Sequence, residues 1–461
     1  MSVLPREAQD YELRLIHGVA LLKQKKKICV MGLGYTGLPT AAMFATHGYE
    51  IIGVDVNAEV ITAINQGRTI IEEPYLDIMV RDAVTSGNLV ARTKPDRADV
   101  FIIAVPTPIK PDKKADLEHV ITATKSILPF LQKGNIVILE STSPTGTVEN
   151  IVLPILARSG LSVGEDLYVA YCPERVLPGC IINEIVENNR IIGGINQKSA
   201  EMVRDLYKTF VKGELILTDA TTAEMCKLME NTYRDVNIAL ANELATICEK
   251  MGINVWEVIS LCNKHPRVNI HRPGPGVGGH CLAVDPYFII EQVPEKAKII
   301  SLSRNVNDTM PEYVVNWIME KLKLFDPPCK VTVLGATYKA NIDDLRGSPI
   351  IKIMDLLEKN DINVALFDPH IQKYRNLQEN IYEAVRDSNA VVLGVDHKEF
   401  KNIEFSKLLP LMKNPLIFDT RNYLDGNSLR NIGFTYFLLG NGQNESIDKT
   451  KKEVAIAEEY S

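Results

Sequence analysis

Long apolar runs are absent from this sequence. No stretch approaches the roughly 20 apolar residues that a membrane-spanning helix needs, and no uninterrupted apolar segment follows the first charges as in a signal peptide. Cysteine is sparse as well, because the 8 cysteines among 461 residues include no C-x-x-C pair. Neither a disulfide framework nor a structural zinc site is therefore expected. We expect a cytoplasmic protein that has free thiols and needs no metal.

An excess of positive charge is also missing. The formal net charge of −7 at pH 7 gives no global basic field that would attract nucleic acid or an anionic membrane, so neither is an expected partner. Any bound phosphate must be held by individually placed cations and backbone amides. A chain of 461 residues is too long for one hydrophobic core, which predicts two or three domains.

Short β-rich runs alternate with helical segments in both halves of the chain. The runs lie at 28–32, 50–55, 100–105, 135–139 and 167–170, and again at 330–335, 363–368, 390–395 and 416–419. This alternation predicts an α/β protein with two Rossmann-like, doubly wound parallel-sheet domains. Between them, apolar residues at helical spacing over 221–251 predict a long central helix, preceded by a shorter one at about 198–212.

The expected divisions of the chain follow from this pattern. They are an N-terminal extension at 1–26, an α/β domain at 27–197, a helical middle at 198–328, a second α/β domain at 329–440 and a polar tail at 441–461.

A glycine-rich turn follows the first predicted strand and opens a helix. It reads Gly32-Leu33-Gly34-Tyr35-Thr36-Gly37. The first glycine permits a tight turn, the second lets a pyrophosphate approach the backbone, and the third lets helix pack on strand. Asp55 lies eighteen residues beyond the last glycine, where a carboxylate bonds the ribose hydroxyls and repels a 2′-phosphate. This set predicts an NAD site rather than an NADP site.

Two threonines follow strands that should end at one edge of the first sheet. Thr107 comes after the run at 100–105, and Thr142 after the run at 135–139. Because ligands of such sheets bind at the carboxyl ends of the strands, both are candidates for the cofactor site. Each could equally cap a turn or a helix.

The segment at 264–286 is rich in glycine and proline, which forbid regular structure, and it ends in Gly278-Gly279-His280-Cys281. Ordered loops of this length are commonly functional. A cysteine on such backbone is accessible and near amides that stabilise a thiolate, so Cys281 is a candidate nucleophile, with inert packing as the alternative. His280 could pair with it on a metal, but no spaced third ligand accompanies them.

Three polar residues share one face of the long predicted helix. Asn231 and Arg234 lie four and seven residues after Lys227, which puts all three on one side. A solvated charged face is one interpretation. The other is an oxyanion and sugar-hydroxyl site, because a cation lies one turn from a hydrogen-bonding amide among apolar neighbours.

Six long motifs carry a family resemblance. They are GLGYTG at 32–37, VPTP at 105–108, YCPERVLPG at 171–179, KLMENTYRDVNIALANE at 227–243, HPRVNIHRPGPGVGGHCLAVDPY at 265–287 and YKANIDDLRGSP at 338–349. With them the chain resembles the UDP-glucose/GDP-mannose dehydrogenase family, and within it the UDP-N-acetylhexosamine 6-dehydrogenase branch. The resemblance implies that 27–197 binds NAD, that 198–328 dimerises and carries the catalytic loop, and that 329–440 binds the UDP-sugar.

The resemblance also implies the chemistry. Two hydrides leave the C6 alcohol of the sugar in succession, so that two NAD act at one site and a carboxylate forms. Cys281 would hold the aldehyde as a thiohemiacetal and then as a thioester. Lys227 would stabilise the developing alkoxide with Asn231 beside it, Asp285 would position a water or a lysine, and Glu174 would serve thioester hydrolysis.

The binding residues that the resemblance implies form two sets. Those for the cofactor are Gly32, Gly34, Tyr35, Thr36, Gly37, Asp55, Thr107, Thr142 and Arg346, with Thr107 at the nicotinamide end and also a candidate catalytic residue. Those for the substrate are Arg175, Val176, Lys227, Asn231, Arg234, His265, Arg267, Gly278, Tyr338, Lys339 and Arg421. Arg267 is often contributed by a neighbouring subunit in such enzymes, so a homodimer or a dimer of dimers is expected.

One position departs from the UDP-glucose branch. That branch has a second glutamate four residues after the one matching Glu174, and this chain has Pro178 there. Arg175 and Arg234 match the acetamido-sugar pattern, since arginine can bond an N-acetyl carbonyl. The expected substrate is a UDP-N-acetylhexosamine, with UDP-N-acetylmannosamine ahead of UDP-GlcNAc, UDP-GalNAc and UDP-glucose.

Two other classes of function are alternatives. A two-electron hydroxyacid dehydrogenase would need a lysine and an asparagine like Lys227 and Asn231 but no thiol, so the GGHC loop and the second α/β domain argue against it. A nucleotide-sugar sensor without turnover would keep Gly34 and Asp55 but lose the catalytic residues, whereas Cys281 is present.

Overall fold

The computed structural model describes residues 26–71 and 73–444. The expected N-terminal extension, apart from residue 26, and the tail beyond residue 444 lie outside these residues. The chain forms two compact units. The first unit comprises the chain to Thr107, Leu117–Thr142 and Gly146–Glu224, and the second comprises Pro108–Asp116, Ser143–Thr145 and the chain from Met225 onward.

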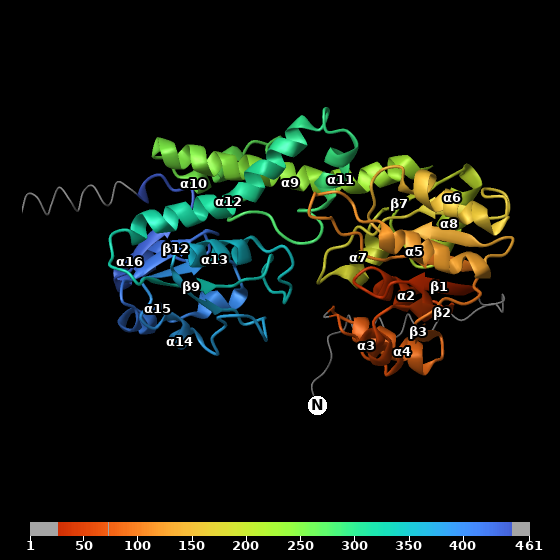
Figure 1. Cartoon of the computed structure of the whole chain (residues 1–461), viewed down its shortest axis with the longest axis horizontal. Helices are drawn as coiled ribbons and strands as arrows, with labels where there is room; N and C mark the ends of the chain where they lie inside the picture. Colours follow the sequence, from red (N-terminus) through yellow and green to blue (C-terminus); the bar gives the residue numbers. More distant parts are fainter. Residues whose placement is uncertain (1–25, 72, 445–461) are drawn as a thin grey trace, which may run out of the picture. The chain divides into compact units, whose positions relative to one another are not determined.

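The first unit is built on an 8-stranded sheet of order β3-β2-β1-β4-β5-β6-β7-β8 (Figure 1). Its strands are β1 (Lys27–Met31), β2 (Glu50–Val54), β3 (Leu89–Arg92), β4 (Val100–Ile103), β5 (Ile136–Leu139), β6 (Tyr168–Tyr171), β7 (Arg190–Gly194) and β8 (Leu215–Asp219). All neighbours pair in parallel except β6 and β7. Alternate residues of β1 join two separate core clusters, so both faces of the sheet are covered, as in a doubly wound fold.

The helices of the first unit lie between its strands in the sequence. They are α2 (Gly37–Thr46), α3 (Ala58–Asn65), α4 (Leu76–Thr85), α5 (Glu118–Ile127), α6 (Leu153–Leu156), α7 (Ile181–Glu187) and α8 (Gln197–Tyr207). The side chains of Asn57 and Asn196 cap α3 and α8 by accepting backbone N–H groups of the first turn.

The second unit combines long helices with a 5-stranded parallel sheet of order β10-β9-β11-β12-β13. The strands are β9 (Lys330–Leu334), β10 (Asn363–Phe367), β11 (Ala390–Leu393), β12 (Leu416–Asp419) and β13 (Thr435–Leu438). The helices are α9 (Ala220–Met251, of which the part from Met225 belongs to this unit), α10 (Val255–Cys262), α11 (Asp285–Gln292), α12 (Lys298–Leu322), α13 (Pro349–Lys359), α14 (Ile381–Val385), α15 (Phe405–Leu408) and α16 (Gly426–Ile432). Apolar residues of α12 and α13 share one core cluster with the sheet.

The predicted fold class is confirmed, and the long helix α9 begins one residue before the predicted range. The structure adds strands that the sequence pattern did not indicate, namely β3, β7, β8 and β13. The expected boundary at residue 197 falls inside the first unit, because α8 and β8 belong to that unit and β8 is a strand of its sheet. The division into separate domains otherwise stays a prediction.

The beginning of the expected polar tail is part of the second unit. Asn441 forms a β-bridge with Asn254, and the buried side chain of Asn444 donates to the Leu438 carbonyl at 2.8 Å. Among the described residues, every helix is too short or too polar to cross a membrane.

Candidate functional site

The glycine-rich turn between β1 and α2 is crowded at two glycines and open at the third. A Cβ on Gly32, where φ is +94°, would lie 2.6 Å from the Ala104 carbonyl oxygen. A Cβ on Gly37 would lie 1.9 Å from the Gly32 carbonyl oxygen, so only glycine lets α2 start this close to the strand. Gly34 is exposed, and nothing lies within 4 Å of the position of its Cβ. The turn therefore leaves its backbone open where a pyrophosphate must approach.

Asp55 follows β2 and is tied to the same turn. Its Oδ2 accepts the backbone N–H of Leu33 at 2.9 Å, and its Oδ1 accepts that of Asn57 at 2.9 Å. The residue is half-buried, and a carboxylate has about four acceptor positions, so it retains acceptors for the hydroxyls of a ribose. Tyr35 packs partly on the core, and Thr36 precedes α2.

The two candidate threonines lie together at the carboxyl ends of β4 and β5. Thr107 Oγ1 donates to the Thr142 carbonyl at 2.5 Å, and Ser141 Oγ donates to the Val105 carbonyl at 2.7 Å. These bonds join the loops that follow the two strands. The position fits the cofactor edge of the sheet, and contact with the cofactor stays a prediction.

Glu174, Arg175 and Val176 lie in the loop after β6, and all three are half-buried. Glu174 Oε1 accepts the backbone N–H of Arg175 at 2.7 Å, and Arg175 Nη1 donates to the Asn189 carbonyl at 2.9 Å. At the end of the loop, the backbone N–H groups of Gly179 and Ile181 donate to the buried carboxylate of Glu73, each at 2.7 Å. The loop is therefore held in a defined conformation.

A cluster of buried ionisable groups lies next to Glu174, and the sequence pattern did not reveal it. Arg190 on β7 donates to Glu174 Oε2 at 3.0 Å and lies 3.5 Å from Glu140 Oε1. Glu140 also accepts the hydroxyl groups of Thr40, at 3.2 Å, and of Tyr207. Burial raises the pKa of Glu140 to about 7, while Arg190 opposes that rise. The one signal in the sequence is a charged residue at the start of the apolar run that forms β7.

The predicted polar face of α9 is directed at Asp285. Asn231 is 3% exposed, and its amide donates to Asp285 Oδ2 while its oxygen accepts from Arg234. Lys227 is half-buried, and its charge is close enough to Cys281 and Asp285 to oppose the rise that burial causes in the pKa of each. The alternative of a merely solvated face is wrong for Asn231, because that side chain is buried.

Glycines let the Cys281 loop pack on the first turn of the C-terminal sheet. A Cβ on Gly278 would lie 2.5 Å from the Gly347 carbonyl oxygen. A Cβ on Gly279, where φ is +89°, would lie 2.9 Å from the ring of Tyr338. Side chains at these two positions would push the loop away, so the glycine pair fixes where Cys281 stands.

Cys281 is exposed at the end of this loop, and its carbonyl accepts the backbone N–H of Asp285 at 2.9 Å. Crowding by neighbouring protein atoms desolvates the sulfur even though the residue is reachable. That desolvation raises the pKa of Cys281 to about 11; Asp285 adds to the rise, and Lys227 and Arg234 oppose it. Burial likewise raises the pKa of Asp285 to about 6. In the free protein at neutral pH, the thiol is therefore protonated.

Three further expected residues lie beside this loop. Tyr338 and Lys339 are half-buried in the turn after β9. Arg346 binds Asp344 with two parallel bonds of 2.9 and 2.7 Å, and Asp344 lies 3.8 Å from Nδ1 of His280. The structure thus places Arg346 next to the loop that ends in Cys281, while its contact with the cofactor stays a prediction.

Arg421 follows β12 and supports the proline- and glycine-rich loop. A Cβ on Gly274 would lie 2.5 Å from Nη1 of Arg421, whose guanidinium also donates to Asp396 at 3.3 Å. The Gly274 N–H donates to Asn242 on α9 at 2.8 Å. The loop is therefore pinned between α9 and the C-terminal sheet.

His265 and Arg267 lie on the exposed start of the same loop. Their side-chain nitrogens are 3.5 Å apart. Across residues 26–71 and 73–444, the hydrogen bonds and ion pairs include none that joins either residue to Cys281. A role of His265 and Arg267 in substrate binding stays a prediction.

One group of described residues has the spacing of metal ligands. The ligand atoms of His370, His397 and Glu399 lie within 4.8 Å of one another. Nδ1 of the buried His397 accepts the backbone N–H of Asn341 at 2.9 Å, so Nε2 carries the proton and faces Asp368 at 3.2 Å. A protonated nitrogen has no lone pair for a metal, and we assign no metal to this group.

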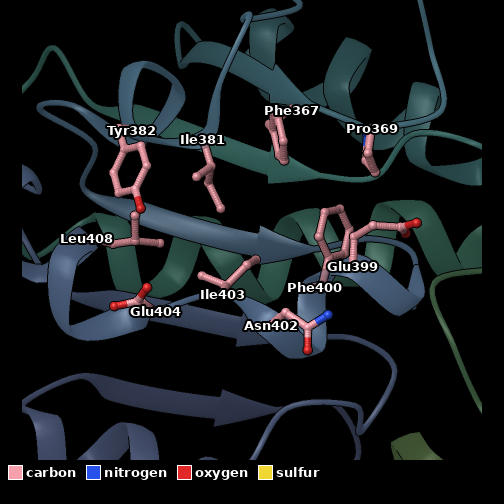
Figure 2. Close-up of a pocket in the computed structure, with 10 residues that line it drawn as sticks. All are labelled: Phe367, Pro369, Ile381, Tyr382, Glu399, Phe400, Asn402, Ile403, Glu404 and Leu408. Atoms are coloured by element: carbon pink, nitrogen blue, oxygen red, sulfur yellow. The ribbon is translucent and has the colours of Figure 1, made fainter.

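A pocket of about 330 Å³ opens beside that group (Figure 2). Glu399 and Phe400 contribute to its wall, and most of its lining is apolar. The residues expected to bind substrate do not line it.

Comparison with known proteins extends the resemblance over most of the chain. Three domain families match consecutive parts: the NAD binding domain of the UDP-glucose/GDP-mannose dehydrogenase family over residues 26–211, its central domain over 221–309 and its UDP binding domain over 332–426. The expected cofactor, NAD, is confirmed by the first of these matches.

Individual relatives are similar over nearly their whole length. A UDP-N-acetyl-D-mannosamine dehydrogenase of Methanococcus vannielii is 50% identical over 429 residues, which are 91% of this chain and 98% of that protein. An NDP-N-acetyl-D-galactosaminuronic acid dehydrogenase of Ralstonia nicotianae is 47% identical, covering 86% of this chain and 96% of that one. The solved UDP-D-ManNAc dehydrogenase of Pyrococcus horikoshii has a TM-score of 0.86 at 40% identity, covering 90% of this chain and 100% of that one.

The position of Asp55 yields a test of cofactor choice. Asp55→Asn keeps an oxygen for the Leu33 N–H but removes the negative charge. We expect the KM for NAD to rise about tenfold, equivalent to ~1.4 kcal/mol, and the preference for NAD over NADP to fall. Steady-state kinetics with both cofactors measures this, with Glu59→Gln on the exposed surface of α3 as the control. An unchanged preference would place Asp55 away from the ribose.

The raised pKa of Cys281 predicts how the thiol reacts with pH. Because only the thiolate is alkylated, the rate of its reaction with iodoacetamide should rise roughly tenfold per pH unit from about pH 7 to 9. Asp285→Asn should speed the reaction at each pH, since that carboxylate raises the pKa of Cys281. Peptide mass spectrometry follows Cys281 beside the exposed Cys180 and Cys262. A plateau below pH 9 would contradict the assignment.

Proposed function

The chain belongs to the UDP-glucose/GDP-mannose dehydrogenase family, and from that premise we propose that it oxidises the C6 alcohol of UDP-N-acetylmannosamine to a carboxylate. As a member of this family it is an NAD-dependent nucleotide-sugar dehydrogenase. The observation that carries the proposal is the gathering of Lys227, Asn231 and Asp285 around the reachable thiol of Cys281. A two-electron alcohol dehydrogenase has no need of that thiol.

The first unit would hold the cofactor. The open backbone at Gly34 and the N-terminus of α2 offer N–H groups to the pyrophosphate, and Asp55 accepts from the ribose. Thr107 and Thr142 lie at the strand ends, where the nicotinamide of such sheets is bound. Bound NAD supplies the chemistry that the chain lacks, because it accepts a hydride from C6.

Lys227 and Asn231 would serve the first oxidation. As hydride leaves C6, the alcohol oxygen becomes alkoxide-like, and a cation with an amide donor stabilises that charge in a site partly shielded from water. Asp285 cannot serve as a free base in this arrangement, since it accepts from Asn231 and is buried. Its role is to keep Asn231 and Lys227 oriented.

Cys281 would carry the second oxidation. Its S–H adds across the aldehyde C=O, giving a thiohemiacetal whose carbon can lose a further hydride. The resulting thioester is hydrolysed: water supplies the second carboxylate oxygen, the C–S bond breaks and the thiol is restored. In sum, one alcohol, two NAD and one water give one carboxylate, two NADH and three protons.

Arg175, Val176 and Arg234 would recognise the sugar. A guanidinium can bond the carbonyl of an N-acetyl group, and Pro178 replaces the glutamate that the UDP-glucose branch carries. Tyr338, Lys339 and Arg421 would hold the uridine and phosphate end, within the part of the chain that matches a UDP binding domain. The similarity to the UDP-N-acetyl-D-mannosamine dehydrogenase of Methanococcus vannielii supports the manno donor. The similarity to the NDP-N-acetyl-D-galactosaminuronic acid dehydrogenase of Ralstonia nicotianae keeps the galacto donor as the alternative.

We further propose that two copies pair through α9. Five large side chains of this helix are exposed by 42 to 66%: Met229, Tyr233, Leu240, Ile247 and Met251. At about 100° per residue they form one stripe, on the side of the helix opposite Asn231. An apolar stripe of this size marks an interaction surface. A second copy covering it would leave the catalytic face free, and it could supply His265 and Arg267 from its own exposed loop.

The stoichiometry of NADH tests the proposed reaction. A panel of UDP-ManNAc, UDP-GlcNAc, UDP-GalNAc and UDP-glucose is followed by absorbance until each limiting sugar is consumed. We expect UDP-ManNAc to be the best substrate and to yield two NADH per sugar. Cys281→Ser should lower acid formation by about 100-fold or more, because a serine hydroxyl is a poorer nucleophile near neutral pH. One NADH per sugar with free aldehyde would refute the four-electron reaction.

Light scattering after gel filtration tests the dimer. Leu240→Asp places a charge in the middle of the apolar stripe, which costs several kcal/mol if the stripe is buried, so we expect a monomer with little activity. Leu324→Asp is the control, because Leu324 is 74% exposed and lies off α9. A monomeric wild type would contradict the proposal, and so would an unaffected Leu240→Asp dimer.

A further inference from the structure

Arg190 is a buried cation shared by two carboxylates. Its side chain is 5% exposed, those of Glu140 and Glu174 are 0% and 10% exposed, and the guanidinium lies 4.5 Å from the centre of the Tyr207 ring. Burying such an ion pair is weak evidence for stability, because desolvation offsets much of the attraction. A cluster of this kind in an enzyme is therefore a candidate for a functional role.

The cluster fixes the orientation of one carboxylate in particular. Glu174 Oε2 accepts from Nη2 of Arg190 at 3.0 Å, and its Oε1 accepts the N–H of Arg175 at 2.7 Å. With a donor on each oxygen, the carboxylate plane cannot turn without breaking a bond. Glu174 is the least buried of the three charged groups, with 10% of its side chain exposed, and a carboxylate has about four acceptor positions, so further acceptors remain.

Arg190 is itself held from behind. The fully buried Glu140 forms an ion pair with the guanidinium at 3.5 Å. Thr40 and Tyr207 in turn donate hydrogen bonds to Glu140. Thr40 belongs to α2, the helix that opens at the glycine-rich turn. The chain of contacts from α2 through Glu140 to Arg190 therefore ties the position of Glu174 to the frame of the cofactor turn.

We propose that Arg190 is a positioning residue for hydrolysis of the thioester, acting by holding the Glu174 carboxylate toward the attacking water. This inference rests on the proposed function. Water adds to the thioester carbonyl carbon as one of its protons passes to Glu174. The C–S bond then breaks, the sulfur of Cys281 takes up a proton, and Glu174 gives up the one that it accepted. The second proton leaves the new carboxylic acid for solvent, so that Glu174 and Cys281 end as they began.

The test separates hydride transfer from hydrolysis. In Arg190→Lys and Arg190→Gln, rapid mixing with NAD and UDP-ManNAc should show a burst of up to two NADH per subunit, followed by a steady rate about 10- to 100-fold below wild type. Mass spectrometry of the quenched and digested protein should find the Cys281 peptide carrying the acyl group. Glu174→Gln should behave in the same way.

Arg204→Lys is the matched control, because Arg204 lies on α8 of the same unit and pairs with Asp205 at the surface. This variant should form NADH at the wild-type steady rate, and the acylated Cys281 peptide should not accumulate. Should Arg190→Gln fail to fold by circular dichroism, Arg190→Lys carries the test alone. The inference is overturned if Arg190→Lys slows the burst as much as the steady rate, or if it turns over like wild type. A wild type that makes one NADH per sugar would instead refute the proposed function.

Discussion

A buried carboxylate, Asp285, is the constraint on which the reactive part of the second unit depends. It is 2% exposed, and an ionised group so far from water must be compensated by donors and cations. Asn231 donates to it and Lys227 acts on it from one turn earlier on α9. This need for compensation explains why the polar face of α9 is directed toward Asp285. Cys281 lies one turn of backbone before Asp285, and its carbonyl accepts the Asp285 N–H.

The first unit also contains buried carboxylates that need a compensating cation. Glu140 and Glu174 are kept in a nearly closed interior by Arg190, much as Asp285 is kept by α9. In each unit a buried acid, Glu140 or Asp285, contacts a polar group that contacts or adjoins the proposed reactive residues. Glycines determine where the backbone is open or closely packed: nothing lies within 4 Å of a Cβ on Gly34, whereas Gly278 and Gly279 let the Cys281 loop pack on its neighbours.

Local geometry could be predicted from the sequence, and the pairing of residues far apart in the chain could not. The cofactor turn with Asp55 and the spacing of Lys227 and Asn231 are short patterns whose geometry follows from one turn or one helix. Arg190 and Glu140 are separated by 50 residues, and nothing nearby in the sequence marks them as partners. The edge strand β3 was missed because it is 4 residues long and only half of it is buried. α8 and β8 were assigned to the helical middle because periodicity does not show which sheet a strand joins.

The central claim is that one thiol holds the aldehyde between two hydride transfers, and a carbonyl reagent in a single-turnover reaction tests it most directly. With one NAD per subunit, isotopically labelled UDP-ManNAc and a hydrazine trap in solution, NADH should form while the trap recovers little labelled aldehyde. In Cys281→Ser the trap should recover aldehyde in step with NADH. If wild type releases aldehyde as freely as the variant does, Cys281 does not hold the intermediate and the account is wrong.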